Sequence, residues 1–359
     1  MDLGIVGPDQ SGKTTIFDAL ARGHAQHGDA RREQLAVVKI PDERLELLAA
    51  LVESEKVTHA ELRLHDLPTL FEKGRAASGE AAESLSRADG LMLVVRAFRR
   101  PDVPHPRGDV DPARDVDDFL ASMLLHDLDI VERRQGKLET QVRSAQRGGE
   151  REEGLREQQL LERIRQRLDG GRALRDDPPP AEDARLLGNY GLLTMKPLLI
   201  LINLDEEDIP RTAEIEAEYG GRFAAAGTFV IAICARLEAE LAELEPAEAE
   251  EFRRELGSPE PALGRLLAEC QRMLGLVTFY TLGKESRAWQ LPVGGTALQA
   301  AGRIHTEIER GFVRAEVIGW QELLDFGSYP EARKQGRLRS EGKQYVVQDG
   351  DVINVLFST

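Results

Sequence analysis

Short apolar runs recur along the first two thirds of the chain, and several are followed by segments with helical spacing of apolar residues. Residues 3–6 form one such run, which ends at Gly7, and residues 15–21 continue with apolar side chains at helical spacing. Buried runs that alternate with helices are typical of a parallel sheet covered on both faces. The pattern therefore predicts an α/β domain with strands at 3–6, 35–40, 62–66, 91–95, 197–202 and 229–233.

A second pattern begins near Leu124. Apolar residues keep roughly coiled-coil spacing among many Arg, Glu and Gln, are interrupted at Gly148 and Gly149, and resume as far as Leu168. Basic and acidic residues nearly balance here, which favours a solvated, salt-bridged surface over a dedicated nucleic-acid stripe. The pattern predicts an antiparallel helical arm inserted over residues 123–189, which ends with the stiff proline run 178–180.

The last part of the chain, beyond Gly275, has short strands of mixed character. They are expected at 277–281, 286–291, 312–318, 344–347 and 352–357, with one helix at about 296–308. This order predicts a small separate α+β domain over residues 276–359. The α/β domain then comprises residues 1–122 and 190–275, on either side of the inserted arm.

A phosphate-binding motif follows the first predicted strand, with glycines at 7 and 12 and then Lys13 and Thr14. Glycine lets the backbone N–H groups approach a polyphosphate closely, lysine supplies a fixed charge, and the hydroxyl is placed to bind magnesium. The next residues open a helix whose N-terminus favours an anion. The other residues expected to line the nucleotide are Asp9, Gln10, Ser11 and Thr15. The alternative is a glycine-rich strand-to-helix turn with a surface lysine.

A candidate magnesium-associated carboxylate, Asp66, stands at the end of the alternating strand 62–66. The alternative is a strand-end carboxylate that caps a loop. The glycine that normally follows in Asp-x-x-Gly is Thr69, so sensing of a γ-phosphate is expected to be altered. No threonine occurs between Thr15 and Thr58 to serve as a switch ligand.

Two later strand ends carry a candidate base-binding loop. Residues 203–206 read Asn-Leu-Asp-Glu where guanine-specific proteins have Asn-Lys-x-Asp, so Asn203, Leu204 and Glu206 are expected beside the base, with weakened guanine selectivity. Asn203 could instead be a turn former after a strand. Cys234, Ala235 and Arg236 take the place of the Ser-Ala-Lys loop that packs on the base.

Composition limits the classes of partner. The 359 residues suggest two or three domains, and the net charge of −16 argues against general nucleic-acid binding. Two cysteines make no disulfide framework, and no apolar segment approaches a membrane span, so we expect a cytoplasmic protein with no membrane or DNA partner. A basic cluster over 333–343 is either a phosphate-backbone contact or a solvated loop.

The chain resembles the YchF family of Obg-like ATPases over nearly its whole length. The most specific stretches are GDVDPARD at 108–115, GLLTMKP at 191–197, RAW at 287–289, QAAGRIHT at 299–306, ERGF at 309–312 and QDGD at 348–351. The resemblance implies a G-type P-loop NTPase domain, a coiled-coil insertion and a C-terminal TGS-like β-grasp domain. The central residues of the phosphate loop differ from the family's Leu-Pro-Asn-Val, and the switch glycine is replaced by Thr69.

The same resemblance implies binding of ATP in preference to, or alongside, GTP, with Mg²⁺ as cofactor. It also implies association with the ribosome or ribosomal RNA, which we expect through the C-terminal domain. Leu70 is similar to the apolar residue that replaces the catalytic glutamine of GTPases in the family. Hydrolysis would then rest on positioning and on charge stabilisation by Lys13 and magnesium.

Three functional hypotheses follow. The first is a slow, magnesium-dependent ATPase that acts as a translation-associated switch. The second is a nucleotide-binding scaffold without hydrolysis, which the altered switch residues favour. The third is an RNA-binding module whose nucleotide domain is structural.

Overall fold

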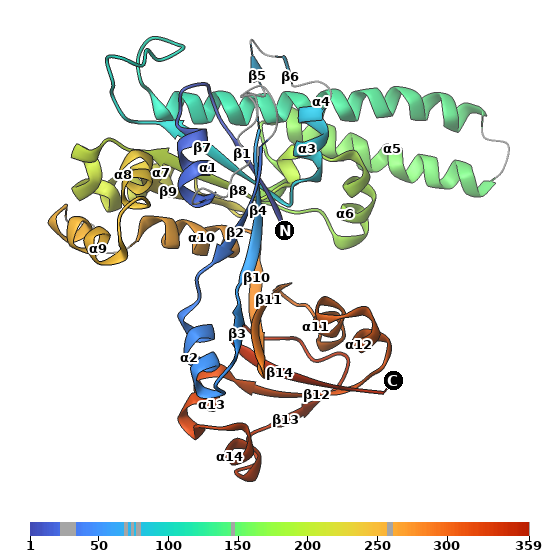
Figure 1. The fold of residues 1–359 in the computed structure, drawn as a ribbon. Helices are drawn as coiled ribbons and strands as arrows, with labels where there is room; N and C mark the ends of the chain where they lie inside the picture. The colour runs from blue at the N-terminus through green and yellow to red at the C-terminus, as the bar shows by residue number, and fades with distance from the viewer. Residues whose placement is uncertain are drawn as a thin grey trace. The chain divides into compact units, whose positions relative to one another are not determined.

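The computed structural model describes residues 1–21, 34–67, 71–72, 75–76, 80–144, 148–256 and 261–358 (Figure 1). Thr69 and Leu70 lie outside the described residues. The chain divides into two compact units: unit 1 comprises residues 1–37 and 63–269, and unit 2 comprises residues 38–62 and 270–359.

Unit 1 is built on a six-stranded sheet in the order β2-β4-β1-β7-β8-β9. Strand β1 pairs in parallel with β4 and β7, and β8 pairs in parallel with β7 and β9, which confirms the predicted parallel α/β sheet. Every residue of β7 and β8 is buried, as expected of central strands covered on both faces. The strands are β1 (Asp2–Val6), β2 (Gln34–Ile40), β4 (Ala60–Asp66), β7 (Gly90–Arg96), β8 (Leu198–Asn203) and β9 (Thr228–Ile233). Residues 38–40 of β2 and 60–62 of β4 are grouped with unit 2.

Helices follow the strands along the chain. The longer ones are α1 (Lys13–Ala21), α3 (Glu80–Arg87), α7 (Thr212–Phe223), α8 (Ala235–Leu241), α9 (Pro246–Glu255) and α10 (Ala262–Met273). Shorter elements are the strands β5 (Phe71–Glu72) and β6 (Arg75–Ala76), the helix α6 (Ala181–Leu187), and the 3₁₀ turns at Leu174–Asp176, Gly188–Tyr190, Leu193–Met195 and Glu206–Arg211. Among the described residues, no helix is long and apolar enough to cross a membrane.

The inserted arm consists of α4 (Pro112–Ser144) and α5 (Gly148–Asp169), which lie side by side (Figure 1). Helix α4 begins eleven residues before the predicted arm, because Asp111 accepts a hydrogen bond from the Arg114 N–H at 3.0 Å and Pro112 suits a first helical position. The buried Asp127 carboxylate accepts hydrogen bonds from the Leu193 and Thr194 N–H groups at 2.9 and 2.8 Å. These contacts bind α4 to the segment before β8, and the arm groups with unit 1.

Unit 2 is a six-stranded mixed sheet in the order β13-β12-β14-β10-β11-β3, with antiparallel and parallel pairs. This confirms the predicted α+β character of the C-terminal part. Its strands are β3 (Lys56–Thr58), β10 (Leu276–Thr281), β11 (Glu285–Pro292), β12 (Phe312–Gly319), β13 (Arg339–Glu341) and β14 (Asp351–Phe357). Its helices are α2 (Glu43–Leu51), α11 (Ala297–Ile304), α12 (Thr306–Arg310), α13 (Trp320–Phe326) and α14 (Tyr329–Lys334).

Two details differ from the sequence-based expectations. Residues 38–62, expected in the nucleotide domain, belong to unit 2, because α2 buries Leu45 and Leu48 against Tyr280 and Val352 and β3 pairs with β11. Residues 344–347 form no strand. Val346 makes only an isolated bridge with Thr296, which starts α11.

Candidate nucleotide-binding site

The loop between β1 and α1 has a backbone shape that requires its glycines. Gly7 and Gly12 have φ angles of 149° and 96°, in the region that disfavours side chains. A Cβ at Gly7 would lie 2.2 Å from the Val94 carbonyl oxygen, and one at Gly12 would lie 2.1 Å from Nδ2 of Asn203. Gln10, between them, also has a positive φ of 62°. The motif glycines are therefore needed for close packing on β7 and β8 as well as for the turn.

Lys13, the first residue of α1, reaches back across this loop. Its Nζ donates to the carbonyl oxygens of Gly7 and Pro8, both at 2.9 Å. Burial lowers the pKa of the Lys13 ammonium, and the Asp66 and Asp9 carboxylates oppose that shift. The ammonium thus stabilises the conformation of the loop through hydrogen bonds to two of its carbonyls.

Thr14 and Asp66 come together although they are far apart in sequence. Parallel pairing of β1 with β4 sets Asp66 opposite Ile5, so the carboxylate stands at the strand ends where the loop begins. Thr14 Oγ1 donates to Asp66 Oδ2 at 3.0 Å, whereas Asp66 Oδ1 is buried and has no hydrogen-bond partner among the described residues. Burial raises the pKa of Asp66, and the hydrogen bond from Thr14 opposes that shift.

These oxygens fit a magnesium ion. Mg²⁺ prefers hard oxygen ligands and is usually held by one or two protein groups together with phosphates and water. An orphaned carboxylate oxygen beside a hydroxyl meets that requirement. In the described part of the chain, no group of three or more His, Cys, Asp or Glu side chains could hold a metal by itself.

Asn203, the last residue of β8, joins two loops. Its Nδ2 donates to the Ser11 carbonyl at 2.9 Å, and its Oδ1 accepts from the Ala235 N–H at 3.0 Å. The side chain is buried, so both bonds lie away from water. Asn203 is therefore a cross-link between the phosphate loop and the start of α8, and not only a turn former.

The other predicted base-binding residues divide into buried and exposed groups. Leu204, Cys234 and Ala235 are buried in the core, and burial raises the pKa of the Cys234 thiol to about 11. Glu206 and Arg236 are exposed, with 3.6 Å between the Glu206 carboxylate and the Arg236 guanidinium.

In the loop itself, Asp9 and Gln10 are exposed, Thr15 is half-buried, and Ser11 is buried. The Ser11 hydroxyl has no hydrogen-bond partner among the described residues. A free buried hydroxyl at this point can donate to a ligand that enters the loop.

The sequence analysis did not identify Phe98 and Arg96 as candidate site residues. Phe98 donates its N–H to the Asn203 carbonyl at 3.1 Å, and its ring edge lies 3.9 Å from the position a Gly12 Cβ would take. Arg96 is buried and lies with its guanidinium 4.4 Å from the centre of the Phe98 ring. Arg96 also donates to the Phe98 and Val103 carbonyls at 3.1 and 2.7 Å. An arginine at the end of a buried strand, where charge is rare, was the available signal.

The predicted basic cluster does not present free charge throughout. Arg333 binds Glu316 at 2.8 Å, Arg337 lies 3.7 Å from Glu322, and Arg339 lies 3.3 Å from Asp351. Lys334 lies 3.5 Å from Glu331. Among these five residues, only Lys343 has a side chain without an ion-pair partner within the described residues.

Comparisons with known proteins agree with this geometry. A family model named YchF-GTPase_C, described as a protein of unknown function (DUF933), matches residues 276–358. The "Ribosome-binding ATPase YchF" of Haemophilus influenzae is 33% identical over 99% of this chain and 98% of that protein. The protein of the same name from Bacillus subtilis is 32% identical over the same shares of the two chains. The structure of the Schizosaccharomyces pombe YchF GTPase aligns with a TM-score of 0.85 at 27% identity, covering 99% of this chain and 97% of that one. The chain therefore belongs to the YchF family.

Proposed function

We propose that the protein is a slow, magnesium-dependent ATPase that associates with ribosomes in the cytoplasm. The observation that carries the proposal is the loop from Gly7 to Gly12, with positive φ angles at both glycines, around the Lys13 ammonium and beside the Thr14–Asp66 pair. Relatives over the full length are named ribosome-binding ATPases, which supports the same function.

Each part of the loop has a role in holding the triphosphate. The backbone N–H groups and the N-terminus of α1 bind phosphate oxygens, and Lys13 exchanges its two carbonyl acceptors for the β- and γ-phosphates. Thr14 and Asp66 would hold a magnesium ion, which would supply positive charge beside the terminal phosphates. Asp9, Gln10, Ser11 and Thr15 complete the lining.

Hydrolysis rests on positioning and charge stabilisation. Lys13 is placed to stabilise negative charge on the transferred phosphoryl group, which such loops do without covalent catalysis. By resemblance to the family, Leu70 stands where other GTPases have a catalytic glutamine. An apolar side chain cannot orient the attacking water. Slow turnover follows from this substitution.

Adenine is the preferred base in this proposal. Glu206 lies 3.6 Å from the Arg236 guanidinium, which also binds Glu240 at 2.9 Å, and this attraction competes with acceptance of guanine N–H groups by Glu206. The Phe98 ring, held from behind by Arg96, provides an apolar face for any purine, while Asn203 and the Leu204 and Ala235 backbone form the far wall. Cys234 is buried in the core next to Ala235.

The ribosome or ribosomal RNA contact is placed on the C-terminal domain, which we assign as TGS-like. Four of the five basic residues of the 333–343 cluster have carboxylate neighbours, so only Lys343 of this cluster offers free charge. Arg310, Arg314 and Lys343 have no ion-pair partner among the described residues and are exposed. They are the candidates for phosphate contacts.

A single-turnover experiment tests the proposed activity. Excess protein is mixed with labelled ATP and magnesium, and phosphate release is followed beside the dissociation constants of ATP and GTP. We expect ATP to bind more tightly than GTP and to be hydrolysed above the background rate only with magnesium. Product at the background rate alone would leave the scaffold hypothesis, and absence of saturable binding of either nucleotide would overturn the whole assignment.

Asp66→Asn should separate stability from function. The pKa of Asp66 is raised in the folded state, so the nucleotide-free protein loses stability as pH rises from the ordinary aspartate range through the raised value. Asparagine removes the buried charge, so at pH 8 we expect the variant to unfold at equal or higher urea concentration, with a gain of up to about 1 kcal/mol. ATP affinity should in turn lose its dependence on magnesium.

Exposed Asp109 supplies the control, because Asp109→Asn changes the same functional group without burial. It should leave the urea midpoint and the magnesium dependence unchanged. An Asp66→Asn protein that still binds ATP more tightly with magnesium would remove Asp66 from the metal site.

A further inference from the structure

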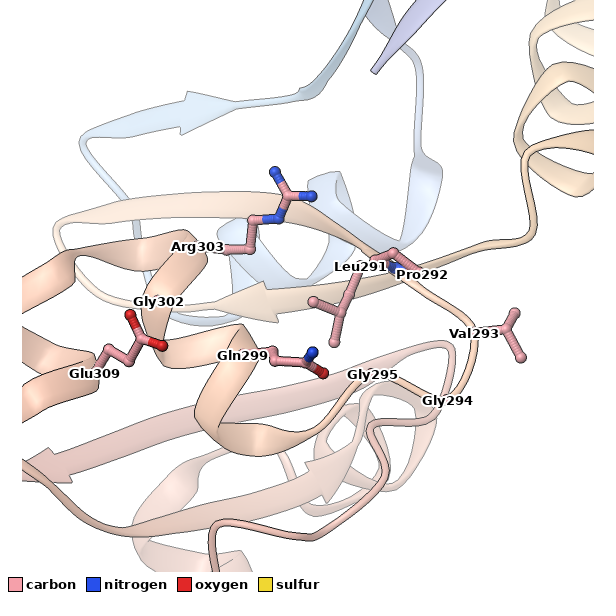
Figure 2. Close-up of a pocket in the computed structure, with 9 residues that line it drawn as sticks. All are labelled: Leu291, Pro292, Val293, Gly294, Gly295, Gln299, Gly302, Arg303 and Glu309. Atoms are coloured by element: carbon pink, nitrogen blue, oxygen red, sulfur yellow. The ribbon is translucent and has the colours of Figure 1, made fainter. Parts of the chain in front are cut away.

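A cavity of about 440 Å³ lies in unit 2, between the turn that follows β11 and the helices α11 and α12 (Figure 2). Its size is within the range of small-molecule sites. Gln299, Gly302 and Arg303 of α11 line one side, Glu309 of α12 lies next to Gly302, and the turn at 291–295 lines the other side. None of these residues is used in the nucleotide site.

Two opposite charges in this cavity lack partners. Neither Arg303 nor Glu309 makes an ion pair or side-chain hydrogen bond within the described residues, and Figure 2 shows their side chains pointing in different directions. Several other charged groups of unit 2 are paired, such as Arg44 with Asp349 at 2.6 Å and Lys56 with Glu285 at 3.1 Å. The cavity therefore offers one free cation and one free anion at separate positions.

The glycine at 302 lets the carboxylate lie close to α11. A Cβ there would lie 2.9 Å from Oε2 of Glu309. Gly302, Arg303 and Glu309 fall in the QAAGRIHT and ERGF stretches by which the family is recognised, yet the nucleotide site gives them no role.

The opposite wall is apolar and already fixed in shape. Leu291 points into the space between the turn and α11 and packs on Gly295, where a Cβ would lie 2.4 Å from its Cδ2. The turn is held by hydrogen bonds from the Gly295 N–H to the Pro292 carbonyl and from the Val347 N–H to the Gly295 carbonyl, at 2.8 and 2.9 Å. A ligand can enter without first ordering the turn, which lowers the entropic cost of binding.

We propose that this cavity binds a small aliphatic zwitterion, a free α-amino acid or a short peptide with both ends free. The ligand carboxylate would pair with Arg303, its ammonium with Glu309, and its side chain would contact Leu291 and Pro292. A phosphate-rich ligand is disfavoured because Glu309 repels it, and a stacked base is disfavoured because no aromatic ring lines the cavity. The proposal does not depend on nucleotide binding at the phosphate loop.

The test uses the full chain with labelled leucine and valine methyl groups, observed by NMR. The probes are L-leucine, L-leucyl-L-leucine, leucinamide and N-acetyl-L-leucine. We expect saturable shifts of the Leu291 and Val293 methyl signals with leucine or the dipeptide. The two blocked derivatives should each bind about tenfold more weakly, since each loses one charge-assisted contact.

Charge-neutral variants make the assignment specific. Glu309→Gln should weaken leucine binding about tenfold and abolish the difference between leucine and N-acetyl-leucine, and Arg303→Gln should do the same for leucinamide. Glu307→Gln, at an exposed glutamate on the same helix as Glu309, serves as the matched control and should leave leucine binding unchanged. Absence of saturable shifts with both zwitterions, equal binding of the blocked derivatives, or shifts of the same methyls by hexa-adenylate RNA alone would each overturn the proposal.

Discussion

Replacement of Lys13 by alanine is expected to reduce the rate of ATP hydrolysis by about a hundredfold or more, to the background rate. Loss of one group that stabilises charge in the transition state typically has an effect of this size. The ammonium donates to two backbone carbonyls of the loop, both at 2.9 Å. Its loss removes charge stabilisation and also the hydrogen bonds that keep the nucleotide-free loop in shape. Single-turnover phosphate release and ATP affinity measure the two effects separately.

Lys39→Ala is the matched control, because Lys39 is an exposed lysine on β2 with no partner among the described residues. It should hydrolyse ATP like the unmodified protein. If Lys13→Ala retained full single-turnover hydrolysis with magnesium, the phosphate loop could not be the place where the reaction occurs.

The phosphate loop was predictable because its chemistry is local. Two glycines, a lysine and a threonine at fixed spacing are required by one turn of backbone around a phosphate, so their order alone indicates the site. The Asp66 position followed from the rule that parallel strands end at one edge of the sheet. Strand β1 pairs with β4 and brings Asp66 to 3.0 Å from Thr14, as that rule requires.

The features that escaped prediction depend on contacts between distant residues. Nothing local shows that Phe98 folds back onto Asn203, since this depends on Arg96 donating to three carbonyls of the same loop, those of Phe98, Arg100 and Val103. Charge counting likewise found basic residues at 333–343 but could not show the carboxylates placed beside them.

The assignment of residues 38–62 to unit 2 also has a non-local cause. Asp42 accepts hydrogen bonds from the Tyr280 hydroxyl at 2.6 Å and from the Arg44 guanidinium at 3.0 Å, and Arg44 binds Asp349 at 2.6 Å. Burial raises the pKa of Tyr280, so its hydroxyl stays protonated and remains a donor. The apolar spacing of α2 predicted the helix but not its partner.

Asn203→Ala should have the second large effect, on both stability and nucleotide binding. The change leaves the Ser11 carbonyl and the Ala235 N–H buried without partners, which costs about 3 kcal/mol of unfolding free energy for two such groups. Because Ser11 lies within the phosphate loop, ATP affinity should fall at least about tenfold as well. Circular dichroism should follow the unfolding. Both tryptophans, Trp289 and Trp320, lie in unit 2, so tryptophan fluorescence would not report on unit 1, which contains Asn203.

Asn203→Asp distinguishes the cross-link from simple loss of volume. Aspartate keeps the acceptor for the Ala235 N–H but turns a carboxylate oxygen toward the Ser11 carbonyl, where Asn203 had a donor 2.9 Å away. The buried, charged carboxylate then faces the carbonyl oxygen, and both are acceptors. This variant should therefore be less stable than Asn203→Ala at pH 8. It should regain stability as the pH falls and the carboxyl group is protonated. Asn354→Ala, which removes one exposed hydrogen bond to Glu316 at 3.1 Å, should leave stability and ATP affinity unchanged. Equal behaviour of the three variants would show that the amide of Asn203 holds neither loop.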